Sequence, residues 1–407
     1  MNVPKLRFKE FTDEWTHCFL SDIAVIQSGL TPSRKIKEYY INGIIPWIKT
    51  TDLNNSYITK IEEKISKKAL DETSIKIFPK NTLLLAMYGG YNQIGRTGLS
   101  TTEITTNQAL SAILFKNTDM NSYFFLNLLN KYKDYWKIVS ASSRKDPNIT
   151  KKDVERFPIT YPALKEQNKI ANFLSTVDKK ISNLENIITT LENQKKGLLQ
   201  QIFNQEIRFK DENGNNYPDW EKKKLGDILK DFYLGGNYKN STKITKYPLL
   251  KMGNLDRGKI NLNKIEYIEE NEPINERDKI HFGDLFFNTR NTPDLVGKVA
   301  IWRNELPLMY FNSNLMKMTF DNNFFMNYKF NTKKVILKLR SIATGTTSVG
   351  AIYTKDLLKL ELNIPCLEEQ TKIADFLSAF DRKIDNQKAQ LEHWKQIKKG
   401  LLQQMFV

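Results

Sequence analysis

The sequence has very few residues that could bind a metal ion or form disulfide bonds. Its 407 residues include two cysteines, Cys18 and Cys366, and three histidines, His17, His281 and His393. Two cysteines provide no disulfide framework and are consistent with a reducing compartment. The histidines stand apart from one another, so the sequence predicts neither a zinc site nor a Ser-His-Asp triad.

Long apolar runs and cofactor-binding motifs are also absent. No stretch approaches the roughly 20 apolar residues that cross a bilayer, and the polar N-terminal segment MNVPKLRFKEF lacks a signal-peptide core. Residues 90–97 imitate a phosphate-binding loop, but Arg96 stands where lysine is required and no apolar helix follows. No dinucleotide fingerprint, nuclease motif or amino-methyltransferase motif is visible. We therefore predict a non-catalytic, cytoplasmic protein with no metal and no cofactor of its own.

Positive charge is in excess. Lysine and arginine number 62 against 46 acidic residues, which gives a formal net charge of +16. This balance suggests an anionic partner and favours nucleic acid over a membrane. Lysine is abundant throughout the chain, so we give charge alone limited weight.

One stretch of sequence occurs twice. Residues Pro162 to Phe203 align without a gap with Pro365 to Phe406, and about half of the aligned positions are identical, far more than chance allows. Both copies predict a long helix, because apolar residues alternate at spacings of three and four. Each helix follows a proline and has a glutamate in its first turn and a lysine pair near its end, which suits the helix dipole. At 1.5 Å per residue, each helix is roughly 60 Å long.

The apolar residues of each predicted helix form a seam that must be covered. The seam residues are Ile170, Leu174, Val177, Ile181, Leu184, Ile188, Leu191 and Leu198 in the first copy, and Ile373, Leu377, Phe380, Ile384, Leu391, Trp394 and Leu401 in the second. Lys195, Gln387 and Lys398 interrupt the seams. We favour antiparallel pairing of the two copies, with the flanking domains at opposite ends and a pseudo-twofold relation. Pairing with a helix of another subunit stays open as an alternative.

The repeat divides the chain into four parts. We predict domains at 1–161 and 205–364 and helices at 162–204 and 365–407. The fold class is α+β, in which two mixed α/β domains are separated by two long helices that form an antiparallel coiled coil.

The second domain repeats the plan of the first loosely. Trp220 echoes Trp15, and Gly297-Lys298 take the place of Gly95-Arg96. In the first domain, residues 44–49 and 81–88 predict strands, and residues 123–135 predict an amphipathic helix. Between matching anchors the two halves differ strongly, which suggests one scaffold that carries two separately chosen sets of loops.

Basic, amide and hydroxyl side chains in these loops are candidates for DNA contacts. They are Arg34, Lys49, Arg96, Asn107, Gln108, Ser142, Arg144 and Lys145 in the first domain, and Lys251, Arg290, Lys298, Arg303, Thr346 and Thr347 in the second. Arginine and lysine bind phosphates, and arginine, asparagine and glutamine can read base edges. Any one of these side chains is more often part of a solvated face, so the set carries more weight than its members.

The order of domains and the motif in each helix resemble the DNA-specificity subunit of type I restriction–modification systems. The motif reads PxLxEQxxIAxFLSxxDxKI and ends in KKGLLQQ in both copies, which include Asp178 and Asp381. Residues 29–34 also resemble the start of that family's target-recognition domain, which adds Thr31 and Ser33 to the candidate DNA contacts. The second domain departs from this pattern at residues 235–238.

The resemblance implies a mechanism. Each domain reads one half of a bipartite, asymmetric site on double-stranded DNA from the major groove. The helix pair sets the spacer between the halves, which lie roughly 34 Å apart when one helical turn separates them. Two modification subunits dock on this scaffold and supply S-adenosylmethionine and adenine methylation. Two restriction subunits, where present, add cleavage that depends on ATP and Mg. Two other classes stay open: an assembly scaffold that reads no DNA, and a self-contained DNA methyltransferase.

Overall fold

A computed structural model gives the structure of the protein. It describes residues 3–90, 92–140, 148–292, 294–345 and 350–407. The chain divides into two compact units: unit 1 contains residues 1–185 and 389–407, and unit 2 contains residues 186–388. Each unit combines a mixed sheet-and-helix domain with part of α6 (Leu164–Phe203) and part of α11 (Leu367–Met405). None of the helices in the described part of the chain combines the length and apolar character that a membrane crossing requires.

The inner part of unit 1 is a five-stranded sheet ordered β2-β9-β6-β7-β4. The elements of this part are β1 (Thr16–Phe19), α1 (Leu20–Ile23), β2 (Ala24–Ser28), β4 (Tyr57–Ile58), β6 (Leu83–Ala86), β7 (Thr97–Ser100), β9 (Leu110–Phe115), α3 (Ser122–Lys131), α4 (Lys133–Ser140), α5 (Lys151–Glu155) and β10 (Pro158–Tyr161). Strand β1 pairs antiparallel with β10, which leads into α6. The sheet and α3 share one apolar core with Leu174 of α6 and with Met405 and Phe406 at the end of the chain.

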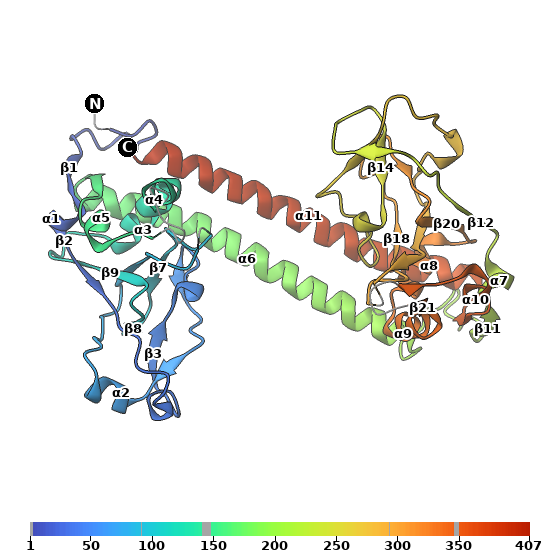
Figure 1. Ribbon diagram of the computed structural model, residues 1–407, viewed down its shortest axis with the longest axis horizontal. Coiled ribbons are helices and arrows are strands. Elements are labelled where there is room, and N and C mark those ends of the chain that lie inside the picture. The colour runs from blue at the N-terminus through green and yellow to red at the C-terminus, as the bar shows by residue number, and fades with distance from the viewer. Residues whose placement is uncertain (1–2, 91, 141–147, 293, 346–349) are drawn as a thin grey trace. The chain divides into compact units, whose positions relative to one another are not determined.

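A smaller outer lobe lies beyond this sheet, on the side away from α6 (Figure 1). It consists of β3 (Ile45–Ile48), β5 (Lys64–Ile65), α2 (Lys67–Glu72) and β8 (Thr105–Thr106). Strand β3 lies in the middle, antiparallel to β5 and parallel to β8. Trp47 and Ile65 are fully buried in the lobe's own small core.

The segment that was predicted as one helix over 123–135 forms two helices, α3 and α4, which are separated at Tyr132. The apolar spacing continues across this break, so the local pattern does not reveal it. The break allows Tyr132 and Trp136 both to pack against Phe157, with ring centroids 5.3 and 4.6 Å away. Tertiary packing therefore overrides the periodic pattern here.

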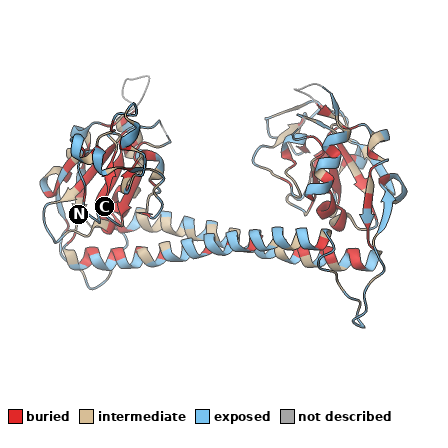
Figure 2. Ribbon diagram, turned by 90° about the horizontal axis from the view of Figure 1, so that it is seen from below, coloured by how far each residue is buried: buried red, intermediate tan, exposed pale blue. Residues whose placement is uncertain are grey.

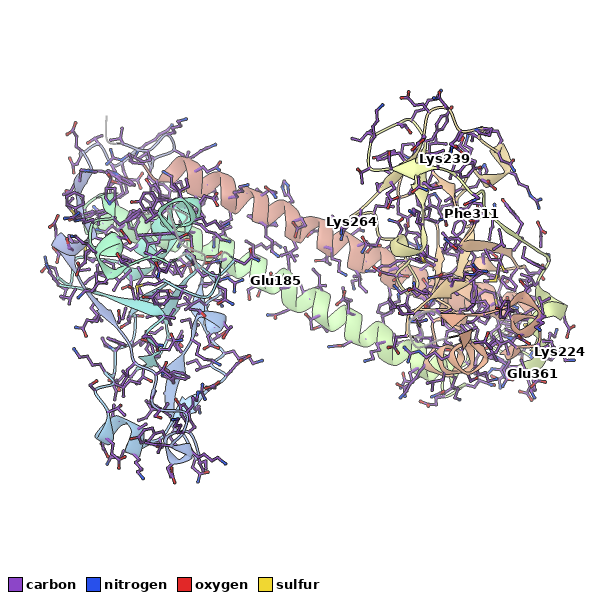
Figure 3. All side chains as sticks on the ribbon, in the orientation of Figure 1. Glu185, Lys224, Lys239, Lys264, Phe311 and Glu361 are labelled. Atoms are coloured by element: carbon purple, nitrogen blue, oxygen red, sulfur yellow. The ribbon has the colours of Figure 1, made fainter. Side chains whose placement is uncertain are left out.

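Unit 2 repeats this arrangement with different lengths. Its inner elements are β11 (Glu221–Lys224), α7 (Leu225–Ile228), β12 (Asp231–Leu234), β16 (Leu285–Asn288), β18 (Val299–Ile301), β20 (Leu315–Thr319), α8 (Asn323–Phe330), α9 (Lys333–Ile342), α10 (Thr354–Leu357) and β23 (Glu361–Ile364). The inner sheet is ordered β12-β20-β16-β18. Strand β11 pairs with β23 and places Lys224 opposite Glu361 (Figure 3), as β1 pairs with β10 in unit 1.

The outer lobe of unit 2 is a four-stranded sheet ordered β13-β15-β14-β19. Its strands are β13 (Asn240–Ser241), β14 (Pro248–Leu250), β15 (Glu266–Ile268) and β19 (Tyr310–Phe311). Strand β14 takes the place of β3, because it too has an antiparallel neighbour, β15, and a parallel one, β19. A further small sheet joins β17 (Arg290–Asn291), β21 (Thr344–Gly345) and β22 (Gly350–Ala351).

The long helices pair antiparallel in both units. In unit 1, Glu185 of α6 forms an ion pair with Lys395 of α11, at 3.2 Å. In unit 2, Glu192 of α6 forms an ion pair with Lys388 of α11, at 2.6 Å. Within unit 1, Asp178 also pairs with Lys398, and within unit 2, Lys195 also pairs with Asp381. In each unit, residue numbers therefore rise along α6 while those of its partners on α11 fall. The predicted fold class, α+β domains with two long antiparallel helices, is confirmed.

The seam residues form the covered face of each helix (Figure 2). The buried seam residues are Ile170, Leu174, Val177, Leu184, Ile188, Leu191, Ile373, Leu377 and Ile384. The half-buried ones are Ile181, Leu198, Phe380, Leu391, Trp394 and Leu401.

Candidate nucleic-acid interface and domain joints

The outer lobe of unit 1 gathers several of the predicted DNA contacts around Glu63. The Arg34 guanidinium donates to this carboxylate at 2.6 Å and the Lys49 ammonium at 2.8 Å. Burial raises the pKa of Glu63, but hydrogen bonds from Lys49 and Arg34 outweigh burial, and the net effect lowers the pKa. The Arg34 guanidinium also lies over the rings of Tyr40 and Trp47, at 4.2 and 5.1 Å. Arg34 is thus held in position while its side chain stays 54% exposed.

The loop that carries Thr31, Ser33 and Arg34 is fixed against β8. At Gly29, a Cβ would lie 2.0 Å from the Thr106 carbonyl oxygen, so only glycine fits. The Thr31 hydroxyl donates to the Gln108 amide oxygen. The fold therefore brings four of the predicted DNA contacts together on one small lobe: Thr31, Arg34, Lys49 and Gln108.

The outer lobe of unit 2 has a similar centre. The Lys251 ammonium donates to Glu266 at 2.7 Å and to the Asn240 side-chain oxygen at 2.9 Å. Lys251 and Glu266 correspond to Lys49 and Glu63, because each lysine directly follows the middle strand of its lobe and binds a glutamate on the antiparallel neighbour's side. Asn240 supplies an amide at the carboxylate–lysine pair where unit 1 has an arginine.

The departure from the family pattern at residues 235–238 does not remove the close approach seen in unit 1. A Cβ at Gly235 would lie 2.3 Å from the Phe311 carbonyl oxygen, on β19. Strand β19 corresponds to β8, so Gly235 takes the place of Gly29 against the same neighbouring strand. The two loops differ in sequence, but each begins at a glycine that packs against the backbone of the corresponding strand, β8 or β19.

The other predicted contacts that the structure describes lie outside these two centres. Lys298 donates to the Leu255 carbonyl at 2.9 Å, and Arg303 binds Asp381 of α11 at 3.4 Å. Arg96 donates to the Asn92 carbonyl at 3.1 Å, and Arg290 lies exposed on β17. Asn107 follows β8, where its side chain accepts from the Ala109 amide at 3.2 Å. Ser142, Arg144, Lys145, Thr346 and Thr347 lie outside the described residues. DNA contact by any of these side chains stays a prediction.

Two aspartates join the long helices to each other and to the domains. In unit 1, Asp178 of α6 accepts from Lys398 of α11 at 2.6 Å and from the Tyr123 hydroxyl of α3. Burial raises the pKa of Tyr123, and the hydrogen bond to Asp178 and its charge raise it further. The aspartate therefore lies where α3, α6 and α11 meet, with about one-fifth of its side chain exposed (19%).

Unit 2 contains the reciprocal joint. Asp381 of α11 accepts from Lys195 of α6 and, at 2.5 Å, from the Tyr328 hydroxyl of α8. Burial, and then the charge of Asp381 and the hydrogen bond to it, raise the pKa of Tyr328. Asp178 and Asp381 occupy the same repeat position, and so do Lys195 and Lys398. Each aspartate thus binds the lysine of the other copy, which is the pattern of an isologous pairing.

A further joint lies at the start of each long helix, where a glutamate of the helix binds an arginine of the domain. Glu166 accepts two hydrogen bonds from Arg7, both at 2.8 Å. Glu369 accepts from Arg208 at 2.8 and 3.2 Å and from the Trp220 indole N–H at 3.1 Å. Hydrogen bonding to these carboxylates is the main cause that raises the pKa of Arg7 and of Arg208.

Sequence reasoning missed the role of these glutamates. It attributed both to the helix dipole, whereas their carboxylates are almost fully buried and bound by arginine (3% and 1% exposed). The signal that could have found them was the matching triplets Arg7-Phe8-Lys9 and Arg208-Phe209-Lys210.

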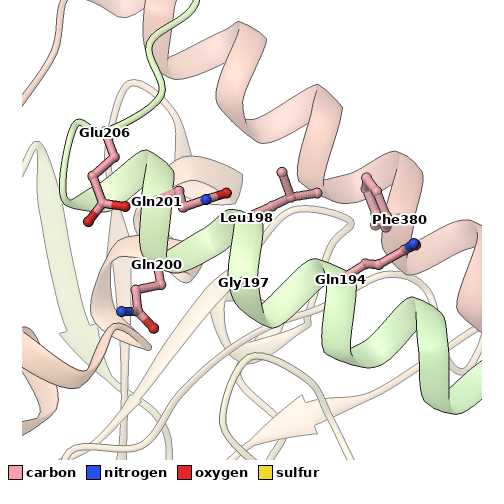
Figure 4. A pocket seen from close by; sticks show the side chains of 7 residues that line it. All are labelled: Gln194, Gly197, Leu198, Gln200, Gln201, Glu206 and Phe380. Carbon is pink, nitrogen blue, oxygen red and sulfur yellow. The ribbon is translucent and has the colours of Figure 1, made fainter.

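One hollow of the described structure has a lining made mostly of amide side chains. A hollow of about 630 Å³ beside the end of α6 is lined by Gln194, Gly197, Leu198, Gln200, Gln201, Glu206 and Phe380 (Figure 4). Glu206 is its only titratable side chain, and amides form most of its polar lining. Across the described ranges, no group of three or more His, Cys, Asp or Glu residues is placed to hold a metal ion.

Comparisons with known proteins match both halves of the chain. The family model described as "Type I restriction modification DNA specificity domain" matches residues 12–193 and 217–394. The MjaIX specificity subunit of Methanocaldococcus jannaschii is 35% identical over 229 residues, which cover 53% of this chain and 52% of the relative. The MjaVIII specificity subunit of the same organism is 26% identical over 421 residues, which cover 98% and 94%. The chain spans about half the length of the first two curated relatives it matches.

Solved structures are similar over the whole chain. A type I restriction–modification S subunit from M. genitalium has a TM-score of 0.61 at 17% identity and covers 100% of this chain and 99% of its own. A chain from a study of complex assembly and conformational transition of the type I R-M system has a TM-score of 0.56 at 15% identity, with 98% of each chain covered. At these identities, the likeness shows the fold.

Proposed function

Because this chain belongs to the family of type I restriction–modification DNA specificity domains, of which it carries two copies, we propose that it is the sequence-specific DNA-binding subunit of a type I complex. Each outer lobe reads one half of a bipartite site on double-stranded DNA. The paired helices set the spacer between the halves and dock the modification subunits. The chain itself performs no catalysis.

The observation that supports this proposal most is the contrast between the duplicated joints and the divergent lobes. The Asp178–Lys398 joint of unit 1 reappears as Asp381–Lys195 in unit 2. In the lobes, by contrast, Arg34 is bound to the central glutamate of unit 1, while Asn240 is bound to the central lysine of unit 2. A duplicated scaffold with two unlike reading surfaces is suited to an asymmetric site. A pure assembly scaffold has no need for lobes that differ.

The chemistry of the lobes is also suited to base recognition. Stacking on Tyr40 and bonding to Glu63 hold Arg34 before DNA arrives, which lowers the entropy cost of a bidentate contact to guanine. Lys49 and Lys251 supply positive charge beside it for phosphate. Together with the net charge of +16, these side chains favour DNA affinity that falls steeply with salt.

The partners and cofactors follow from the same proposal. Two modification subunits bind this chain and carry S-adenosylmethionine for adenine methylation. Two restriction subunits, in systems that have them, contribute ATP, Mg and DNA cleavage. This chain contributes recognition and geometry, and we place no cofactor on it.

Mapping of methylated adenines tests the proposal. The chain is produced with its modification subunits in a host that lacks adenine methylation, and the host genome is sequenced for modified bases. We expect one asymmetric bipartite motif with a fixed spacer. Exchange of residues 235–250 for those of a relative with a different site should change one half of the motif only.

Two outcomes would favour other functions. Affinity that depends on salt but not on sequence, measured with modification subunits present, would support an assembly scaffold. S-adenosylmethionine binding by the isolated chain in calorimetry would support a self-contained methyltransferase.

A further inference from the structure

The last two turns of the long helices are identical in the two copies, whereas the middle of the helices is not. Residues 195–201 and residues 398–404 both read KKGLLQQ. The ten residues just before them, 185–194, share no identical position with their counterparts at 388–397. Exposed positions of the same two helices have therefore diverged completely, so a duplication that left both copies alone does not account for the identical ends.

Packing and the joints account for only part of this identity. Lys195 and Lys398 form the joints, and Leu199 and Leu402 pack against the cores of their units. Four identical positions remain in each copy, and their residues are exposed except for the half-exposed Gly400. They are Lys196, Gly197, Gln200 and Gln201 in α6, and Lys399, Gly400, Gln403 and Gln404 in α11.

The glycine in each set is not required by the helix that contains it. Gly197 and Gly400 lie inside their helices, and neither has a positive φ. A Cβ added at either glycine would meet no described atom within 4 Å. Glycine is the poorest helix former apart from proline, so an exposed glycine weakens the helix without a return in packing. A glycine at this position in both copies therefore indicates that another backbone approaches the helix closely here.

The two helix ends also have matching surroundings. The Gln404 carbonyl accepts from the Leu6 amide at 2.9 Å, and the Gln201 carbonyl accepts from the Ile207 amide at 3.3 Å. Leu6 and Ile207 are each 40% exposed, and each precedes the arginine of a joint. Each helix end thus combines a glycine, two amides, a lysine and an exposed apolar side chain, and each lies within one unit.

The hollow beside Gly197 favours a protein partner over DNA (Figure 4). Its lining includes the half-buried apolar side chains of Leu198 and Phe380, which a phosphate does not cover. It also includes the exposed carboxylate-bearing residue Glu206, which repels phosphate. Amides beside an apolar floor are suited to a polypeptide, which brings both hydrogen-bonding groups and apolar side chains.

We propose that these two helix ends are equivalent docking surfaces, one in each unit, and that each binds one copy of the same modification subunit. The backbone of that subunit approaches Gly197 in unit 2 and Gly400 in unit 1. One partner that binds at two places explains why the two ends stay identical while the middle of the helices diverges. This inference rests on the proposed function, which gives docking to the helix pair, and it adds where each subunit binds.

The test fills the space beside each glycine without weakening the helix. Complexes are prepared from modification subunits and the full chain, either wild type or with Gly197→Leu, Gly400→Leu or both replacements. Asn186→Leu is the matched control, because Asn186 is exposed on the same side of α6, three turns away, and its counterpart is Ala389. Native mass spectrometry over a concentration series gives the number of modification subunits bound and the affinity for each. Urea unfolding of each full chain checks the fold.

Each single replacement should affect one modification subunit only. Wild type and Asn186→Leu should bind two. Gly197→Leu and Gly400→Leu should each bind one as wild type does and the other at least about tenfold more weakly, because the new side chain overfills the contact. The double variant should bind both weakly. Leucine is a better helix former than glycine, so all variants should unfold at no lower urea concentration than wild type.

Three results would overturn the inference. The single variants keep both modification subunits at full affinity, or Asn186→Leu loses as much as they do, or they keep both subunits and lose DNA affinity instead. In each case the wild-type complex still methylates a bipartite site, so the proposed function would stand while docking lies elsewhere. If the wild-type chain binds no modification subunit, the proposed function itself fails, and this inference fails with it.

Discussion

Asp178 and Asp381 each connect the two long helices to each other and to a domain. Each accepts from a lysine on the opposite long helix and from a tyrosine on its own domain. The lysines that interrupt the apolar seams, Lys195 and Lys398, are the lysines of these joints. A half-buried lysine in a seam is costly in any alignment that leaves it without a carboxylate, so the joints favour this one register.

Exchange of the charges of Asp178 and Lys398 tests whether this joint stabilises the pairing of the long helices. Asp178→Asn should lower the free energy of unfolding of unit 1 by about 1–3 kcal/mol, because Lys398 then keeps its charge without its partner. Asp178→Lys combined with Lys398→Asp should recover most of that loss. Urea unfolding measures both effects. Glu192→Gln is the matched control, because its pair with Lys388 is exposed and should be worth less than about 1 kcal/mol. An equal loss for both single variants would contradict the predicted difference.

Lys329 is a buried cation in the core of unit 2. Its ammonium lies over the rings of Phe203 and Trp220, at 5.2 and 4.9 Å, and the residue is only 6% exposed. Burial is the main cause that lowers its pKa to about 7. Lys329 is the seventh residue after Asn322, the N-cap of α8. The seventh residue after Asn121, the N-cap of α3 in unit 1, is Leu128, which is buried in an apolar core.

Stability should therefore depend on pH through Lys329. Its pKa is lower in the folded state than in the unfolded state, so the unfolded chain binds more protons between pH 7 and 10 and stability rises with pH in that range. The slope should approach about 1.4 kcal/mol per pH unit at most. Lys329→Leu should raise stability at pH 7 and remove this part of the slope. Urea unfolding at pH 7 and pH 9 measures the difference between variant and wild type; an identical pH dependence would show that Lys329 does not titrate in this range.

At the element scale, local pattern predicts some features and misses others. The two long helices follow from the seam alone, because apolar residues recur at spacings of three and four from Ile170 to Leu198, a period that only a helix satisfies. The break between α3 and α4 at Tyr132 does not follow, because packing against Phe157 decides it. In the outer lobe of unit 1, the strand predicted at residues 44–49 is confirmed as β3. Its short neighbours, such as the two-residue β8, escape prediction because they are defined by partners far away in the chain. The ion pairs of the joints connect residues that lie between 159 positions (Arg7 and Glu166) and 220 positions (Asp178 and Lys398, 398 minus 178) apart, and the sequence shows these residues only as matching letters in two repeats.

The long helices offer a direct test of the spacer. Seven residues inserted after Glu185 and seven after Lys388 keep all four joints and lengthen the helix pair by roughly 10 Å. With base pairs about 3.4 Å apart, the spacer should grow by about three base pairs while both half-site sequences stay unchanged. Methylation mapping measures this change. An insertion in α6 alone should abolish methylation, because the register of one joint is then lost. Unchanged spacing in the double insertion would exclude a ruler function for the helices.

At the scale of the whole molecule, the reciprocal joints indicate that the first half of the chain, residues 1–204, could pair with a second copy of itself. The first half of the chain carries both an aspartate and its complementary lysine on one helix, Asp178 and Lys195. It also ends in Ile202 and Phe203, the repeat counterparts of Met405 and Phe406, which complete the core of unit 1. Two copies of residues 1–204 could thus supply to each other what residues 365–407 supply in the full chain.

Residues 1–204 alone should therefore form a homodimer through two Asp178–Lys195 pairs. Assembled with modification subunits, this dimer should methylate a symmetric site, in which the half-site of unit 1 appears twice in inverted orientation. Sedimentation gives the oligomeric state and methylation mapping gives the site. Lys195→Asp should weaken the dimer by placing two acids together, and the addition of Asp178→Lys should restore it. A stable monomer, or a dimer that the double exchange does not rescue, would show that the joints do not determine the pairing of the two halves.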